Sequence, residues 1–427
     1  MLVRASERYV PADLTFRNST ACPCYRDYTK DALVYGNEWD QSHVWDDDWF
    51  GSAKPKTTDH RLEGRFAGTP VPTNMSRPVH NSYGRITSTV NNDPTKYTTR
   101  ANEFCGLPVD MPLPGCKEMI GCLDTDNLVD FHSCAESYLH GDLHAIFGGV
   151  WDCPYSIKPV IEAMPHLDKL LGNIGCKAKS LYTTLWNERI MVCPDTCSDD
   201  TPFSECSCVC PLLRDGDLTF DKKYDLITGG NNAEPGNDLL LKYIHHKYLD
   251  REELYVNGSS AGHVWTFTNA TTDENEFLIE WFLNFSCHPG KLGAMSTAAS
   301  ANDPIFWPLH PIFDRLWAFL RVAPEFSHFN HTWVDTQSCQ GHDYHDIMPF
   351  KDLLGEHSGH YYTNQELYQL FDPSSPTLPY MYDNFDWGHC HTATNGHDDL
   401  SSELTEAELF ISGEEIYRRY MALQPNL

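Results

Sequence analysis

The sequence predicts a mainly α-helical protein with long loops and one cysteine-rich insertion. Apolar residues recur at three- and four-residue steps over residues 127–147 and again after Pro311, which is the period of an amphipathic helix. Between these segments, five cysteines crowd into residues 193–210. Hydrophobic residues make up 41% of the 427 residues, so we expect a chain that folds around a sizeable core.

The elements follow in order along the chain. Residues 1–125 are rich in Asn, Asp, Thr, Pro and Gly, which predicts long loops pinned by scattered aromatic residues and cysteines. The helix over 127–147 can be capped by Asp124 or Asp126 and ended by Gly148-Gly149. Further helical spacing covers three segments, 156–192 in pieces, 237–256 and 273–284.

Two prolines divide the segment that begins at Asp303. Pro308 and Pro311 exclude one continuous helix, so we expect an Asp303-capped turn and then a helix with Pro311 at its first position. Its core face comprises Ile312, Leu316, Phe319 and Leu320. A last helix is expected near 403–421, with an acidic first turn and a basic last turn.

Charge excludes several classes of partner. The formal net charge of −29 repels nucleic acid and anionic membranes. No apolar stretch reaches the roughly 18 to 20 residues of a membrane span. We therefore expect a small-molecule partner, a second copy of the chain or an extracellular assembly.

Cysteine usage points to an oxidising compartment. A cluster among 16 cysteines suggests either zinc or disulfides, and Asn-x-Ser/Thr sequons favour the disulfides of a secreted glycoprotein. These sequons begin at Asn18, Asn74, Asn257, Asn269, Asn284 and Asn330. The first residues lack the apolar core of a signal peptide, so the signal lies upstream or an internal Met was taken as the start.

Three histidines are the first candidates for metal ligands. His140 and His144 are four residues apart on the predicted helix, so both imidazoles can reach one ion. Neutral imidazole suits copper, zinc, iron and nickel. Spacing alone is weak evidence, because a solvated or core pair has the same pattern. His310 lies in Asp303-Pro-Ile-Phe-Trp-Pro-Leu-His310-Pro-Ile-Phe-Asp314-Arg-Leu-Trp317.

These motifs resemble the tyrosinase family of type-3 copper proteins. In that family, Asp-Pro-x-Phe, then His, then Asp-Arg-x-Trp carries the last ligand of the second copper, and His-x-x-x-His followed by Gly-Gly supplies the first two. The resemblance implies a tyrosinase-like helical bundle in which His140, His144 and His310 hold one copper. It also implies an oxidoreductase that uses dioxygen to oxidise phenols or catechols.

The same resemblance divides the chain. Tyr380-Met-Tyr382 is similar to the Tyr-x-Tyr element that closes the family's catalytic domain, which predicts a domain over 1–390 and an extension over 391–427. The three chosen ligands require a cysteine-rich insertion over about 150–285.

A rival ligand set remains open. The spacing from His288 to Met295 and Asp303 also matches the family's second ligand, but Asn284 then occupies the first ligand position. Because an amide is a poor copper ligand, we favour the complete triad. His288 then lies near it, where it supports a ligand or has a structural role. Asp314, one turn after His310, can orient this part of the site or be a surface or Arg315-paired carboxylate.

The first copper site is not found. The resemblance implies a Trp-His-Arg element before His140, where the chain offers only His43, His60, His80 and His132. His60-Arg61 follows Asp59 without a helical pattern, and His132 reads as a surface residue. The chain either begins after the first site or has lost it.

Three functions follow from this half-site. The first is an extracellular copper oxidase, in which Gly141 after the first ligand favours catechol oxidation over monophenol hydroxylation. The second is a non-catalytic secreted structural or interaction protein on a tyrosinase-like scaffold. The third is a mononuclear copper or zinc protein with tautomerase-like chemistry.

Overall fold

The computed structural model describes most of the chain in separate stretches. They are residues 28–70, 97–187, 189–194, 219–228, 246–257, 259–297, 300–333, 343–353 and 357–373, with isolated residues at 202–211, 244, 355 and 375–418. These residues are mainly helical, with short two- to four-stranded sheets, so the predicted fold class is confirmed. The chain divides into two compact units.

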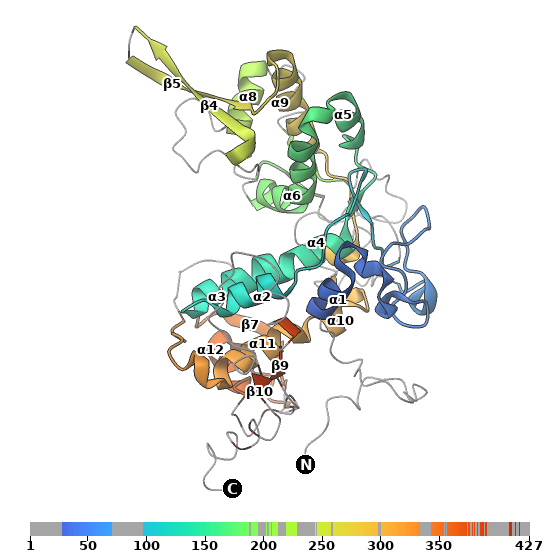
Figure 1. Cartoon of the computed structure of the whole chain (residues 1–427), viewed down its shortest axis with the longest axis vertical. Helices are drawn as coiled ribbons and strands as arrows, with labels where there is room; N and C mark the ends of the chain where they lie inside the picture. The colour runs from blue at the N-terminus through green and yellow to red at the C-terminus, as the bar shows by residue number, and fades with distance from the viewer. Residues whose placement is uncertain are drawn as a thin grey trace. The chain divides into compact units, whose positions relative to one another are not determined.

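Unit 1 comprises Met1–Trp39, Pro112–Leu143 and Trp307–Leu427. In Figure 1, helices α2 and α3 lie beside α11 and α12. The Phe131 ring of α3 lies 5.5 Å from Trp317 of α11, which in turn lies 6.1 Å from Tyr368 of α12. Its helices are α1 (Tyr28–Tyr35), α2 (Cys116–Leu123), α3 (Leu128–Cys134), the π-helix η5 (Ala135–Gly141), α11 (Pro311–Val322) and α12 (Asn364–Leu370).

The strands of unit 1 are short. They are β7 (Ile347–Lys351) paired with β8 (Tyr361–Thr363), and β9 (Phe385–Asp386) paired with β10 (Phe410–Ile411). β10 falls inside the helix predicted over 403–421, so the prediction is wrong at Phe410 and Ile411. These two residues pair in register with β9, a contact that no local pattern indicates. Much of the rest of that predicted helix lies outside the described residues.

Two helices cross the boundary between the units. α4 (Asp142–Gly148) continues directly from η5, and α10 (Phe306–Leu309) directly precedes α11. The run from Leu128 to Gly148 confirms the helix predicted over 127–147. Its cap is Asn127, whose side chain accepts a hydrogen bond from the Asp130 N–H, so the prediction of Asp124 or Asp126 is wrong. An N-cap side chain accepts from the backbone N–H two or three residues later, and Asn127 is at the position that reaches Asp130.

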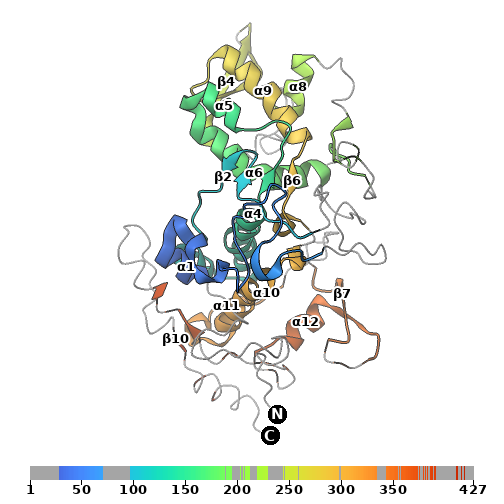
Figure 2. The same ribbon diagram turned by 90° about the vertical axis from the view of Figure 1, so that its right-hand side faces the viewer.

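Unit 2 comprises Asp40–Met111 and His144–Phe306. Figure 2 shows α5, α6 and α9 packed together. Its helices are α5 (Lys158–Ala163), α6 (Asp168–Asn187), α8 (Phe220–Thr228) and α9 (Thr272–Cys287). Its strands are β1 (Glu103–Phe104), β2 (Leu107–Pro108), β3 (Val150–Trp151), β4 (Leu249–Val256), β5 (Ser259–Phe267) and β6 (Lys291–Leu292).

The hairpin of β4 and β5 corrects one prediction. Helical spacing predicts a helix over 237–256, but residues 249–256 form β4 and pair antiparallel with β5 from Leu249↔Phe267 to Val256↔Ser259. Short apolar patterns fit a helix or a strand, and the partner strand decides between them. By contrast α9, with its Thr271–Glu274 capping box, confirms the helix predicted over 273–284.

Short 3₁₀ segments link the elements in both units. In unit 1, η12 (Pro324–Phe326) follows α11. η2 (Gly36–Gln41) follows α1 and includes the last residues of the first segment of unit 1 and the first residues of unit 2. In unit 2 they are η3 (His43–Trp45), η4 (Gly64–Phe66), η6 (Pro165–Leu167), η9 (His246–Tyr248), η10 (Ala294–Ser296) and η11 (Ser300–Asn302). Within the first 125 residues, the described ranges 28–70 and 97–125 are mostly such turns and loops, as predicted, although α1 and α2 interrupt them. The rest of that predicted loop region lies outside the described residues.

Candidate metal centre

His140 lies in the unusual π-helical segment of unit 1. Residues 135–141 make the wider i→i+5 turn, a form that is rare and frequent at functional sites. The wider turn brings the Glu136 carbonyl oxygen within 3.2 Å of where a Cβ at Gly141 would stand. The Tyr28 hydroxyl of α1 donates to the Leu139 carbonyl at 3.2 Å. Tyr28 thus supports the turn that carries His140.

His140 meets His310 within unit 1. Their Nε2 atoms lie 3.0 Å apart, although 170 residues separate them in sequence. Phe313 lies edge-on to both rings, at 5.2 Å from His140 and 5.9 Å from His310. Two Nε2 atoms at this distance can bind one ion at about 2.0–2.1 Å with an angle near 95°, the bond length of imidazole to zinc. The pair therefore fits two ligands of one metal ion.

His310 directly precedes the helix that carries Asp314. α11 begins at Pro311, as predicted, and its predicted core residues Ile312, Leu316, Phe319 and Leu320 are buried. Asp314 Oδ2 accepts hydrogen bonds from Tyr380 at 2.9 Å and Tyr382 at 2.5 Å. Burial and the Asp314 carboxylate both raise the pKa of each tyrosine, so both hydroxyls stay protonated and donate. Asp314 thus joins the predicted ligand helix to the Tyr-x-Tyr element.

His144 belongs to unit 2, because the boundary falls directly before it in the helix. Its ring is buried, and Nδ1 lies 2.6 Å from the Met295 carbonyl oxygen. Since a carbonyl only accepts, Nδ1 carries the proton and Nε2 keeps its lone pair. A metal-binding imidazole commonly has its other nitrogen fixed in this way.

Glycines explain how the chain leaves this helix. Gly149 has φ +65°, and a Cβ there would lie 2.3 Å from the Ala101 carbonyl oxygen. A Cβ on Gly148 would lie 2.1 Å from the Ser296 hydroxyl oxygen. Directly after them, β3 pairs with β6 through Val150↔Leu292. The chain that leaves the His144 helix therefore runs beside the chain that returns toward His310, which supports the predicted insertion between them.

His288, the rival ligand, ends α9 in unit 2. Its Nδ1 donates to the Asn284 carbonyl at 2.9 Å, and its ring lies 5.3 Å from Tyr155. The Asn284 side chain donates to the Glu280 carbonyl within the same helix, at 2.9 Å. Asn284 is thus occupied as a helical residue, and an amide adds no copper ligand to His288.

The histidines before His140 lie in varied settings. The His43 side chain is 89% exposed beside Asp46, and His132 is half-exposed beside Glu136. His60 has φ +55°, and its ring lies 4.8 Å from Trp151 in a tilted arrangement. His80 lies outside the described residues. Among the residues that the structure describes, none of these belongs to a group of three metal-ligating side chains.

Disulfides account for the described part of the cysteine cluster. Among the residues that the structure describes, the pairs are Cys105–Cys153, Cys116–Cys390, Cys122–Cys134, Cys193–Cys208 and Cys210–Cys287. The disulfide interpretation of the cluster is thus confirmed for Cys193, Cys208 and Cys210. Cys197 and Cys206 lie outside the described residues.

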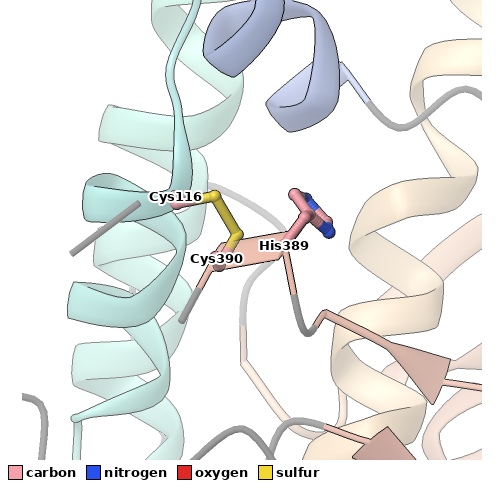
Figure 3. Close-up of side chains that lie close together, drawn as sticks. All are labelled: Cys116, His389 and Cys390. Atoms are coloured by element: carbon pink, nitrogen blue, oxygen red, sulfur yellow. A yellow bond between two sulfur atoms is a disulfide. The ribbon is translucent and has the colours of Figure 1, made fainter. Parts of the chain in front are cut away.

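A second group of ligand-type side chains lies in unit 1. Figure 3 shows His389 beside the sulfur atoms of Cys116 and Cys390, which are joined to each other. Thr29 of α1 bonds His389 Nε2 at 2.9 Å. A metal ligand must be a thiolate, and these sulfurs form a disulfide, so the oxidised chain has no metal site here.

The sequons differ in their surroundings. Asn257, Asn269 and Asn330 are exposed, and the first two lie in turns with positive φ. Asn284 is half-buried within α9. Asn18 and Asn74 lie outside the described residues.

Sequence reasoning missed two features around the motif. Arg100, which no motif marks, is the buried partner of Asp303. The bond between Asp314 and the two tyrosines was also missed. The sequence signal for this bond was the pair Asp314-Arg315 after His310, together with the downstream Tyr380-Met-Tyr382. In the described part of the chain, no helix is long and apolar enough to cross a membrane.

The comparisons with known proteins give one match. Residues 243–321 match the family model described as the common central domain of tyrosinase. The matched range contains His288 and His310 but begins after His140 and His144. No curated protein and no solved structure matches the chain. The predicted resemblance to the tyrosinase family is thereby confirmed over residues 243–321, which include the motifs around His310.

Proposed function

We propose that this chain is an extracellular oxidase of the type-3 copper class, in which His140, His144 and His310 bind one copper through Nε2. The observation that carries the proposal is the 3.0 Å approach of His140 Nε2 to His310 Nε2, in a chain with a tyrosinase central-domain match. His144, four residues after His140, supplies the third imidazole of the proposed set. Disulfides in both units support the extracellular location.

The surrounding residues prepare the histidines for a cation. The proton on His144 Nδ1 is held by the Met295 carbonyl, which leaves Nε2 as the donor to a metal. Phe313 places an apolar ring edge-on beside both members of the His140–His310 pair. Copper, when bound, supplies the one-electron redox chemistry by which dioxygen oxidises a catechol to a quinone. Because that oxidation takes two electrons, a second copper with its own ligands completes the proposed site.

Copper binding tests the ligand set. We expect His140→Ala, His144→Ala and His310→Ala each to lower the copper content and to stop catechol-dependent oxygen consumption. His132→Ala is the matched control, because His132 lies on the same helical run but pairs with Glu136 at the surface, and it should retain copper. Metal content by mass spectrometry and quinone absorbance are the measurements.

If His288 is the ligand instead of His144, the effects of the two substitutions on copper content are exchanged. If His288→Ala removes copper while His144→Ala retains it, His288 replaces His144 as the ligand. Zinc retained in place of copper, without oxidase activity, favours the mononuclear zinc protein.

A second function has its own observation. Among the described residues, the groups of metal-ligating side chains include no second set of three histidines. This favours a non-catalytic secreted structural or interaction protein on the same scaffold. A metal-loaded preparation that neither retains copper nor oxidises catechol selects this second function.

A further inference from the structure

A segment near the predicted end of the domain straps the helix that follows His310. We define the C-terminal strap as Tyr380, Tyr382, Phe385, Trp387 and Cys390, all in unit 1. Both tyrosine hydroxyls donate to Asp314, and the Tyr382 hydroxyl also lies 3.2 Å from the Pro311 carbonyl oxygen. Pro311 and Asp314 are in the first turn of α11, directly after His310.

The middle of the strap packs along the same helix. Trp387 is fully buried, and the guanidinium of Arg315 lies 4.5 Å from its ring centroid. Phe385 lies 5.5 Å from Phe319 of α11. Such cation–π and ring contacts, when buried, hold their partners in a defined orientation.

The far end of the strap is covalently fixed. Cys390 joins Cys116 at the first position of α2, as Figure 3 shows. α2 packs against η5, the π-helix that carries His140. The strap therefore connects the helix after His310 to a neighbour of the segment that presents His140.

Asp314 does not need to touch an imidazole to act on His310. Its Oδ2 atom accepts from both tyrosines, and Ile312 and Leu316 on either side of it are buried. Fixing Asp314 and the Pro311 carbonyl fixes the first turn of α11. The His310 ring extends from the N-cap of that turn toward His140.

We propose that the C-terminal strap positions His310 for metal binding, and that Tyr382 is its principal positioning residue. The proposal rests on the proposed function, because it takes His310 to be a copper ligand. The Tyr382 hydroxyl lies closer to Asp314 Oδ2 than the Tyr380 hydroxyl does, at 2.5 Å against 2.9 Å, and shares its one proton with the Pro311 carbonyl oxygen at 3.2 Å. This geometry ranks Tyr382 above Tyr380.

The test measures Cu²⁺ affinity of the full chain by competition with a chromophoric chelator. Residues that support a metal ligand typically contribute 10–100-fold in affinity. We expect Tyr382→Phe to weaken Cu²⁺ binding by about 10-fold or more and Tyr380→Phe by less. Both variants keep the aromatic ring and lose only the hydroxyl.

Tyr368→Phe is the matched control. Tyr368 lies in the same unit and contacts the second half of α11, at Trp317 and Arg321. These contacts do not involve the first turn of that helix. The Tyr368→Phe variant should bind Cu²⁺ with the same affinity as the unmodified chain. In a His310→Ala background, Tyr382→Phe should have no further effect on affinity, because the residue that it positions is gone.

Amide hydrogen exchange gives a second readout without metal. Tyr382→Phe should speed exchange in the peptide that spans 310–318, and Tyr368→Phe should not. Equal Cu²⁺ affinity in Tyr382→Phe and the unmodified chain overturns the role of the strap, as does an equal loss with and without His310. An unmodified chain that binds no Cu²⁺ overturns the proposed function instead, and the two failures are thereby distinguished.

Discussion

Arg100 and Asp303 form a fully buried, bidentate ion pair in unit 2. Arg100 Nε lies 2.7 Å from Oδ2 of Asp303, and Nη2 lies 2.6 Å from Oδ1. Arg100 Nη1 also donates to the carbonyls of Phe50, Gly51 and Ser52, each at 3.1 Å. Asp303 accepts from the Ile305 N–H as well, which confirms the predicted capped turn. The pair joins the Asp-Pro turn of the motif to a loop some 250 residues earlier.

Removing one partner of this pair should destabilise the chain strongly. Arg100→Ala leaves the Asp303 carboxylate buried and uncompensated, for which we expect a loss of about 3–5 kcal/mol in the free energy of unfolding. Arg100→Lys should not restore it, since an ammonium cannot replace the bidentate contact and the carbonyl contacts together. Urea unfolding measures the loss.

Lys54→Ala is the control for that experiment. Lys54 pairs with Asp40 at 3.1 Å, and both side chains keep more than a quarter of their exposure, so we expect a loss of about 1 kcal/mol or less. Equal losses in Arg100→Ala and Lys54→Ala would contradict the role of burial.

Gly149→Ala should also destabilise the chain. Its φ of +65° is unfavourable for alanine, and the new Cβ would meet the Ala101 carbonyl oxygen. We expect a loss of about 2 kcal/mol or more in the free energy of unfolding. Gly172→Ala in α6 is the control, because a Cβ at this position meets nothing within 4 Å. We expect it to raise the free energy of unfolding by about 0.5–1 kcal/mol. An unchanged free energy of unfolding in Gly149→Ala would show that the backbone near Ala101 shifts to accommodate the new Cβ.

Sequon occupancy should follow the local structure. In a chain secreted from eukaryotic cells, we expect glycans on Asn257, Asn269 and Asn330, which are exposed. Asn284 should remain unmodified, because it is half-buried and its amide donates to the Glu280 carbonyl within α9. Mass spectrometry of glycopeptides before and after enzymatic deglycosylation is the measurement. A fully occupied Asn284 would require α9 to open before modification.

His60 should make the stability depend on pH. Burial lowers its pKa from the usual 6.5, against the opposing effect of Asp59. Between that lowered pKa and 6.5, the folded chain binds fewer protons than the unfolded chain, so its stability rises with pH in this window and falls on acidification. We expect His60→Gln to lose part of this slope in urea unfolding series below pH 6.5.

The exposed His132 provides the comparison for that series. His132→Gln should keep the slope of the unmodified chain. If His60→Gln keeps it as well, proton binding at His60 does not contribute to the acid response.

The sequence by itself determined the features whose causes lie within a few residues. The helical period over 127–147, the start of α11 at Pro311 and the glycine end after His144 depend on local geometry, which the residues themselves carry. The tyrosinase motifs around His310 were also local, and the family match confirms them. The ligand set and the domain bounds remain predictions.

Only the tertiary structure decided which distant residues meet. The carboxylate of Asp303 found Arg100 across 203 positions, His310 met His140 across 170, and Asp314 met Tyr382 across 68. The strand at 249–256 likewise depends on its partner β5 rather than on its own spacing. Each of these outcomes is a contact whose energy depends on packing and burial, and a one-dimensional pattern contains neither.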